Sequence, residues 1–129
     1  MREILFRGKR KDNDEWVEGN YGEYYNGEKK VSCISILSKK TISGSWCYDV
    51  ILETVGQFTG LTDKNGTKIF EGDIIRDADG DVMIVKWLTE GATFVLEPKP
   101  YVSVHFYSTL PSEIEVIGNI HDNSELLTE

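Results

Sequence analysis

The segment from Thr54 to Ile75, TVGQFTGLTDKNGTKIFEGDII, limits the possible folds of this chain more than any other feature. Glycine and asparagine tolerate the left-handed backbone of tight turns, in which β-branched residues are strained. Six residues carry this special turn chemistry: Gly56, Gly60, Asn65, Gly66, Gly72 and Asp73. We interpret the segment as architectural, with a tight loop, a turn over Asp63 to Gly66, and a strand that enters a small barrel at Gly72.

Alternating apolar side chains predict β-strands along most of the remaining chain, and no window shows a convincing helical period. Between Val82 and Glu97 the pattern predicts a hairpin, in which Gly91 supplies the positive φ of the turn. Because both faces of its first strand are apolar, that strand should be central. The expected strands are Ile4–Arg10, Glu15–Tyr25, Val31–Leu37, Val82–Trp87, Ala92–Glu97, Tyr101–Tyr107 and Glu113–Ile120.

A length of 129 residues is typical of one domain with one modest core. We expect a single domain over 1–129 with a soft internal boundary near residue 52, which separates an N-terminal β subdomain (1–52) from a barrel-like part (53–129). Residues 38–49 are polar and read as a loop or junction. The expected fold is mainly β, with a small SH3-like barrel or partly open β-sandwich in the C-terminal half and the N-terminal hairpin and strand packed on it.

The charge of the chain argues against a general polyanion binder. The net charge is -8 and the pI is near 4.8, whereas affinity for nucleic acid comes mainly from Lys and Arg that neutralise phosphates. The one basic run, Arg7 to Lys11, is followed at once by four acidic residues, which favours a solvated hairpin rim over a phosphate site.

The sequence also predicts the compartment. No stretch approaches the ~20 apolar residues of a membrane span, and the first residues lack the apolar run of a secretory signal. We therefore expect a cytoplasmic protein with no membrane partner. Cys33 and Cys47 form no CxxC motif, and in a reducing cytoplasm we expect free, partly buried thiols rather than a disulfide or a zinc site.

Two acidic clusters are candidates for chemistry. Asp77, Asp79 and Asp81 resemble the start of a calcium loop, but the remaining ligand positions of such a loop are absent, so we expect a polar turn and no metal. Glu71 and Asp73 flank Gly72 at strand spacing and could form a carboxylate pair. We interpret them instead as the polar face of a strand, with Asp73 also bonding the backbone of the preceding turn.

Nucleophilic catalysis would need the fold to bring Cys33 close to His105 or His121. The sequence contains no serine-centred elbow, no Walker loop and no dinucleotide-binding glycine pattern. We therefore predict no catalytic residue and no cofactor. Four aromatic residues in weakly patterned regions, Tyr24, Tyr25, Trp46 and Tyr48, are instead candidates for a self-association or partner surface, since exposed rings are enriched at interfaces.

Three parts of the chain resemble the YopX family of phage and prophage proteins. They are the opening MREILFRGKRKDNDEWVEGNY, the central QFTGLTDKNGTKIFEGDII, and the closing IEVIGNIHDNSELL. In the central block Phe58 and Phe70 stand where the family commonly has Tyr. The resemblance implies a gene carried by phages or prophages of low-GC Gram-positive bacteria, a product in the cytoplasm of the bacterial host, and a β-rich fold. It supplies no activity.

We expect a non-enzymatic phage accessory protein that acts through protein contacts and can associate with itself. A nucleic-acid-associated module is the alternative, because small barrels often bind nucleic acids, although the charge disfavours it. A small enzyme with a carboxylate site is the least favoured alternative.

Overall fold

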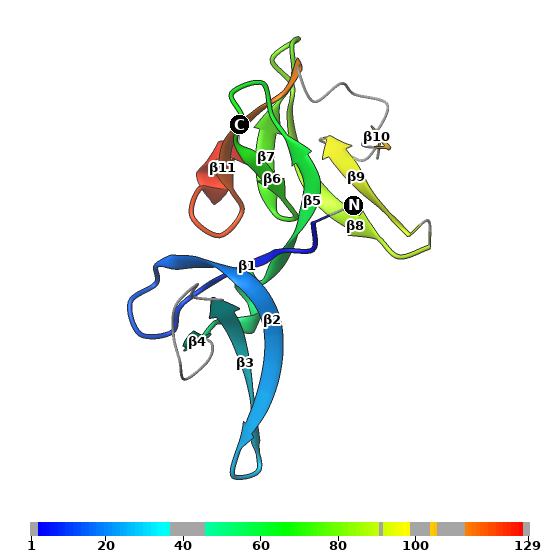
Figure 1. The fold of residues 1–129 in the computed structure, drawn as a ribbon. Helices are drawn as coiled ribbons and strands as arrows, with labels where there is room; N and C mark the ends of the chain where they lie inside the picture. Colours follow the sequence, from blue (N-terminus) through cyan, green and yellow to red (C-terminus); the bar gives the residue numbers. More distant parts are fainter. Residues whose placement is uncertain (1–2, 37–45, 91, 99–103, 106–112, 128–129) are drawn as a thin grey trace. The chain divides into compact units, whose positions relative to one another are not determined.

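The computed structural model describes residues 3–36, 46–90, 92–98, 104–105 and 113–127. Strands dominate these residues and no α-helix occurs among them, which confirms the mainly β prediction (Figure 1). None of the helices in this part of the chain is long and apolar enough to cross a membrane. The chain forms two compact units, Met1–Phe58 and Thr59–Glu129, each described here by itself.

The first unit is an antiparallel sheet with strand order β4-β3-β2-β1-β5. Its elements are β1 (Phe6–Lys9), β2 (Trp16–Asn26), β3 (Lys29–Ile36), β4 (Trp46–Asp49), the short 3-10 helix η1 (Leu52–Thr54) and the beginning of β5 (Gly56–Thr62). The expected loop over 38–49 is wrong at its end, because Trp46–Asp49 is a strand that pairs with β3. This short strand has no apolar alternation of its own, and its pairing with β3 defines it. The rest of that loop prediction lies outside the described residues.

The long β2–β3 hairpin changes neighbours along its length (Figure 1). Strand β2 pairs with β1 from Trp16 to Gly19 and with β3 from Asn20 to Asn26. At this transition the backbone of β3 comes very close, since a Cβ atom on Gly19 would lie 2.2 Å from the carbonyl oxygen of Ser35. Glycine is therefore required here for close approach, a role that the sequence alone does not reveal.

One face of the first sheet carries the core of this unit. Successive strand residues point to opposite faces, so the paired Tyr21, Ile34 and Tyr48 lie on the same side. The fully buried members of the cluster are Ile34 and Val50, with Val17 9% exposed. The partly buried side chains packed against them are Phe6, Tyr21, Ile36, Tyr48 and Val55.

The second unit contains a five-stranded antiparallel sheet with the order β10-β9-β8-β7-β11. Its elements are β6 (Lys68–Phe70), β7 (Asp73–Arg76), β8 (Val82–Leu88), β9 (Thr93–Pro98), β10 (Val104–His105), β11 (Glu115–Asn119) and the 3-10 helix η4 (Ser124–Leu127). Strand β8 lies between β7 and β9, as its two apolar faces predicted. In the predicted hairpin Gly91 lies outside the described residues, and the neighbouring Ala92 has a φ of 49°.

The core of the second unit combines residues from several strands. Its buried members are Ile69, Ile75, Met83, Val85, Leu96 and Ile114, with Phe94 and Val116 packed against them. The two antiparallel sheets of the chain form no closed barrel within its described residues, which agrees with the partly open β-sandwich among the two expected alternatives. The packing of the N-terminal part on the C-terminal part stays a prediction.

The central segment forms turns fixed by carboxylates. Gly66 and Gly72 have φ values of 82° and 92°, a region that favours glycine. Asp63 is buried, and its Oδ1 accepts the backbone N–H groups of Asn65 at 2.8 Å and Thr67 at 2.9 Å. Its Oδ2 accepts the N–H of Val116 at 2.9 Å, so one side chain closes the turn and joins it to β11.

Asp73 differs from the expected polar strand face, because its side chain is only 1% exposed. Its Oδ2 accepts the backbone N–H of Phe70 at 2.7 Å, the bond to the preceding turn that the sequence predicted. Burial of a carboxylate requires such hydrogen bonds, and alternation along the strand does not reveal that the site is enclosed. Glu71, on the other side of Gly72, is half-buried.

Candidate functional site

The first unit contains an open cavity of about 480 Å³ beside the edge strand β4. Three of its lining residues directly follow β1: Arg10, Lys11 and Asp12. Three others belong to β4: Cys47, Tyr48 and Asp49. Tyr24 of β2 completes the lining. Two of the four predicted interface aromatics, Tyr24 and Tyr48, therefore meet in this cavity.

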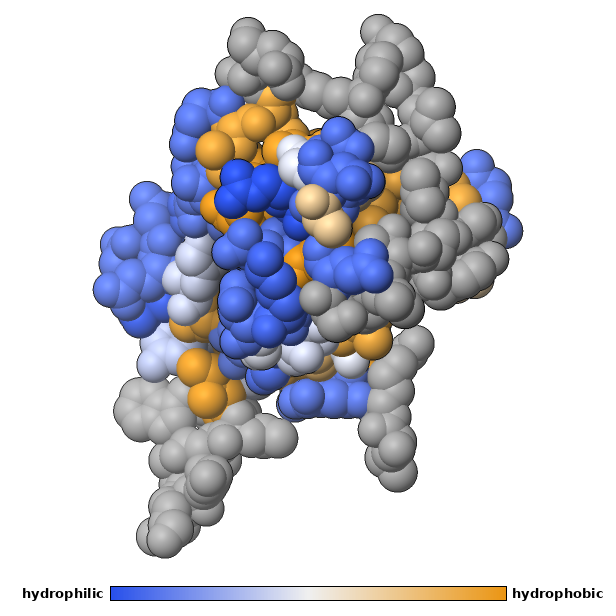
Figure 2. Space-filling view, turned by 90° about the horizontal axis from the view of Figure 1, so that it is seen from above, coloured by the Kyte–Doolittle hydropathy of each residue, from blue (hydrophilic) through white to orange (hydrophobic). Residues whose placement is uncertain are grey.

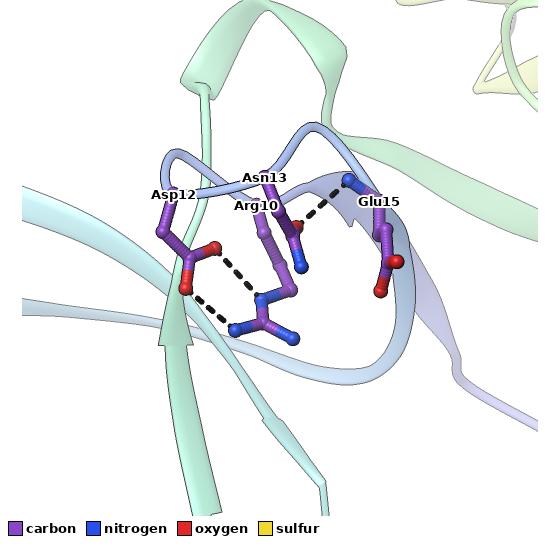
Figure 3. A network of polar contacts seen from close by, with 4 residues as sticks. All are labelled: Arg10, Asp12, Asn13 and Glu15. Carbon is purple, nitrogen blue, oxygen red and sulfur yellow. Dashed lines mark hydrogen bonds and ion pairs between the residues drawn. The ribbon is translucent and has the colours of Figure 1, made fainter.

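Hydrogen bonds within the turn after β1 hold the guanidinium group of Arg10 in place (Figure 3). Arg10 donates from Nε to Asp12 Oδ1 at 2.9 Å and from Nη2 to Asp12 Oδ2 at 2.6 Å, and Asn13 Oδ1 accepts the N–H of Glu15 at 3.0 Å. The side-chain bond with Arg10 lowers the pKa of Asp12, and the same bond raises the pKa of Arg10.

The guanidinium group of Arg10 also lies over the ring of Tyr48, 4.2 Å from its centroid. Its charge is thus balanced by Asp12 and its face is covered by an aromatic ring. A cation with both a carboxylate and a ring as partners is poorly suited to capture a phosphate. At Arg10 this arrangement favours a hairpin rim over a phosphate site.

Tyr24 connects the hairpin to the edge strand. Its hydroxyl donates to Asp49 Oδ1 at 2.8 Å, and this bond raises the pKa of Tyr24. The ring is still 41% exposed, so it presents an aromatic surface at the cavity. Tyr25 points to the opposite face of the strand and is 69% exposed. The side chain of Trp46 lies outside the described part of the chain.

The two cysteines are free thiols on neighbouring strands. In the register of β3 with β4, Cys33 is opposite Asp49 and Cys47 is opposite Ser35, which puts both thiols on one face. Cys33 is buried and Cys47 is exposed in the cavity. Burial and a side-chain hydrogen bond with Cys47 raise the pKa of Cys33 to about 12. The spacing of the cysteines in the sequence gave no signal of this contact.

The other candidate residues are not among those that line this cavity. Cys33 belongs to the first unit and His121 to the second, and the side chain of His105 lies outside the described residues. The carboxylate oxygens of Asp77, Asp79 and Asp81 lie within 4.8 Å of one another. However, Asp77 Oδ1 accepts the backbone N–H groups of Asp79 and Asp81, as a polar turn between strands requires.

The charge of the chain is distributed unevenly between the units. Residues 1–58 contain nine basic and nine acidic side chains, whereas residues 59–129 contain five basic and thirteen acidic ones. The whole net charge of -8 therefore belongs to the second unit, and the cavity lies in the neutral one. On the face drawn in Figure 2 hydrophobic side chains are interspersed with hydrophilic ones, without one wide apolar patch among the coloured residues.

Comparisons with known proteins identify relatives of the whole chain. The model of a family described as YopX protein matches residues 5–128. The crystal structure of protein EF1440 from Enterococcus faecalis is similar with a TM-score of 0.59 and 24% identity, covering 98% of this chain and 99% of that one. No curated protein sequence gave a significant match. At this identity the structural likeness shows a shared fold.

Proposed function

The chain belongs to the YopX protein family, and on this premise we propose that it is a phage or prophage accessory protein that binds another protein and catalyses no reaction. The proposed site of action is the cytoplasm of the bacterial host. The partner surface is the outer half of the β2–β3 hairpin together with the adjoining cavity.

The observation that carries this proposal is the unpaired outer edge of β2. Within β2, only Trp16–Gly19 pair with β1, and no described strand pairs with the same edge of residues 20–26. An edge of this kind presents a row of free N–H and C=O groups that can accept a further strand. It is therefore suited to recognise an extended segment of a protein through main-chain hydrogen bonds.

The side chains of this edge support the same proposal. Proteins commonly protect free edges with charged residues, yet the only charged residue between Asn20 and Asn26 is Glu23. Glu23 is already engaged, because it accepts from Tyr21 at 2.8 Å and pairs with Lys30 at 3.4 Å. The exposed rings of Tyr24 and Tyr25 are typical anchors of an interface.

The groups in the cavity support a binding role rather than a catalytic one. Arg10 is engaged by Asp12 and Tyr48, and Asp49 accepts from Tyr24. Among the described lining residues the thiol of Cys47 has no imidazole beside it to act as a base. A lining that combines two aromatic rings with charged groups of balanced sign suits recognition of a partner side chain.

The test is affinity purification of the tagged full chain from its host during infection or prophage induction. We expect one protein partner in stoichiometric amount, and the double variant Tyr24→Ala/Tyr25→Ala should lose it. Leu52→Ala is the matched control, because it removes another exposed apolar side chain from η1 of the same unit and should keep the partner. Recovery of nucleic acid in place of a protein, or equal capture by all variants, would contradict the proposal.

The second candidate is nucleic-acid binding, which one feature of the first unit favours. On the face of β1 and β2 opposite to the core, the Trp16 ring has the guanidinium of Arg7 at 4.7 Å and the ammonium of Lys9 at 5.8 Å from its centroid. Aromatic and cationic side chains together are common in single-strand binding. A gel shift that weakens as salt rises would support this alternative.

A further inference from the structure

The two thiols of the first unit form a pair, of which only Cys47 lines the cavity of the proposed partner surface. Cys33 and Cys47 lie diagonally across β3 and β4 on one face, close enough that the Cys47 thiol contributes to the raised pKa of Cys33. Cys33 is buried, with only 5% of its surface exposed, while Cys47 is exposed at the cavity. An accessible thiol in contact with a sheltered one is the arrangement in which an oxidised first thiol can be captured by the second.

The structure also determines the order of reaction. Oxidants and alkylating agents react with thiolates at accessible sites. Burial keeps reagents away from Cys33, and a pKa near 12 instead of 9.0 lowers its thiolate fraction roughly a thousandfold near neutral pH. Cys47 should therefore react first.

We propose that Cys47 is an oxidation site and that Cys33 is its resolving thiol, so that a hydroperoxide converts the pair into an intramolecular disulfide between β3 and β4. The proposal is independent of the protein-binding function. Transient, redox-sensing disulfides are the kind that intracellular proteins form.

The chemistry balances with one equivalent of hydroperoxide. The Cys47 thiolate attacks one peroxide oxygen, the O–O bond breaks, and the products are Cys47 sulfenic acid and hydroxide, or the alcohol when the oxidant is organic. The sulfur of Cys33 then attacks the sulfur of Cys47, the S–O bond breaks, and water leaves with the proton of Cys33. In total two thiols lose two electrons and two protons.

The diagonal placement of the two cysteines affects how easily their disulfide is reduced. Diagonal residues of neighbouring strands are farther apart than directly opposed ones, so the bond requires a small movement of the edge strand β4. Strained disulfides are more easily reduced than relaxed ones. The disulfide should therefore form under oxidant and be lost again with a thiol reductant.

The test uses the full chain, reduced and then treated with hydrogen peroxide at equimolar amount. We expect an intact mass lower by two hydrogen atoms, a Cys33–Cys47 crosslinked peptide on digestion, and restoration of both thiols by dithiothreitol. This measurement needs no variant, so it remains valid if substitutions impair folding. A mass raised by oxygen atoms, or disulfides only between chains, would overturn the proposal.

Two matched variants separate the roles. Cys33→Ser should let Cys47 oxidise but stop at sulfenic acid, which a dimedone-type probe traps, whereas Cys47→Ser should leave Cys33 reduced. In the native protein iodoacetamide should label Cys47 at least a hundredfold faster than Cys33. Equal labelling of the two thiols, or peroxide reactivity that survives in Cys47→Ser, would contradict the assignment.

Discussion

Single residues with several backbone partners hold the turns of this protein together. Asp63 is buried and accepts three backbone N–H groups, two within its own turn and one from β11. Burial alone would raise the pKa of this carboxyl group, but the bonds from Val116, Thr67 and Asn65 together lower it. The charged form is therefore the one that the fold prefers.

Asp63→Asn should destabilise the protein by about 3 kcal/mol at pH 7, because the new amide group faces an N–H donor and the charge-assisted bonds are lost. A carboxyl with a lowered pKa in the fold contributes stability above its ordinary pKa of 3.8, and loses it as the pH falls through the folded value. In urea unfolding from pH 7 to pH 3, the free energies of unfolding of the natural protein and of Asp63→Asn should therefore converge as the pH falls. The exposed Asp79→Asn is the control, and a constant gap down to pH 3 would contradict this prediction.

Substitution by alanine should reduce stability by different amounts at Gly19 and Gly66. At Gly19 the new Cβ would meet the carbonyl oxygen of Ser35 at 2.2 Å, so the strands must separate, at a cost of about 3 kcal/mol. A Cβ atom on Gly66 would meet nothing within 4 Å, so the cost is only that of a φ of 82°, about 1 kcal/mol. Thermal unfolding of Gly19→Ala and Gly66→Ala compares them, and similar losses of stability would show that close approach at Gly19 is unimportant.

At the scale of elements, the outer half of the β2–β3 hairpin has few supports. Among the described strands, β2 pairs beyond Gly19 with β3 alone, and a two-stranded ribbon is marginally stable by itself. The bond from Tyr24 to Asp49 connects this ribbon to the edge strand β4. The hairpin should therefore open locally more easily than the core of its unit.

Tyr24→Phe removes only the hydroxyl and should lower the local stability of the hairpin, because the hydrogen bond to Asp49 is lost. Amide hydrogen exchange at Tyr25 and Lys30 should then be faster, while exchange at Ile34 stays slow. Tyr25→Phe is the matched control, because among the described residues its hydroxyl has no partner in the structure. Unchanged exchange in Tyr24→Phe would show that the bond to Asp49 does not hold the ribbon.

At the scale of the whole molecule, the net charge of -8 belongs to one unit and the proposed interface to the other. Like charges on two copies repel over a distance that salt shortens, from about 30 Å at 0.01 M to about 8 Å at 0.15 M. Self-association through the neutral unit should thus be favoured by salt, whereas binding to nucleic acid should be weakened by it.

Light scattering at low and moderate salt should accordingly show an average mass that rises with salt and with protein concentration. Tyr25→Lys should abolish the rise, because it adds a charge at the free edge of β2. A strict monomer under all conditions would exclude self-association and leave a different protein as the proposed partner. The same salt series with a single-stranded oligonucleotide tests the alternative function.

The sequence by itself determined the strand-rich class and the positions of most turns. Gly66 and Gly72 predict turns because glycine tolerates a positive φ, and the apolar residues of Val82–Trp87 predict a strand that is covered on both faces. Both signals come from residues that are close together in the chain. The family resemblance of the central block is equally local.

Only the tertiary structure decided which side chains meet. The contacts of Tyr24 with Asp49, of Cys33 with Cys47 and of Asp63 with Val116 depend on the register between strands. A slip by one residue would turn every side chain to the other face, and no local pattern specifies the register of a short strand such as β4. The burial of Asp73 and the cavity at β4 were hidden from the sequence because enclosure is a property of packed strands and not of one strand.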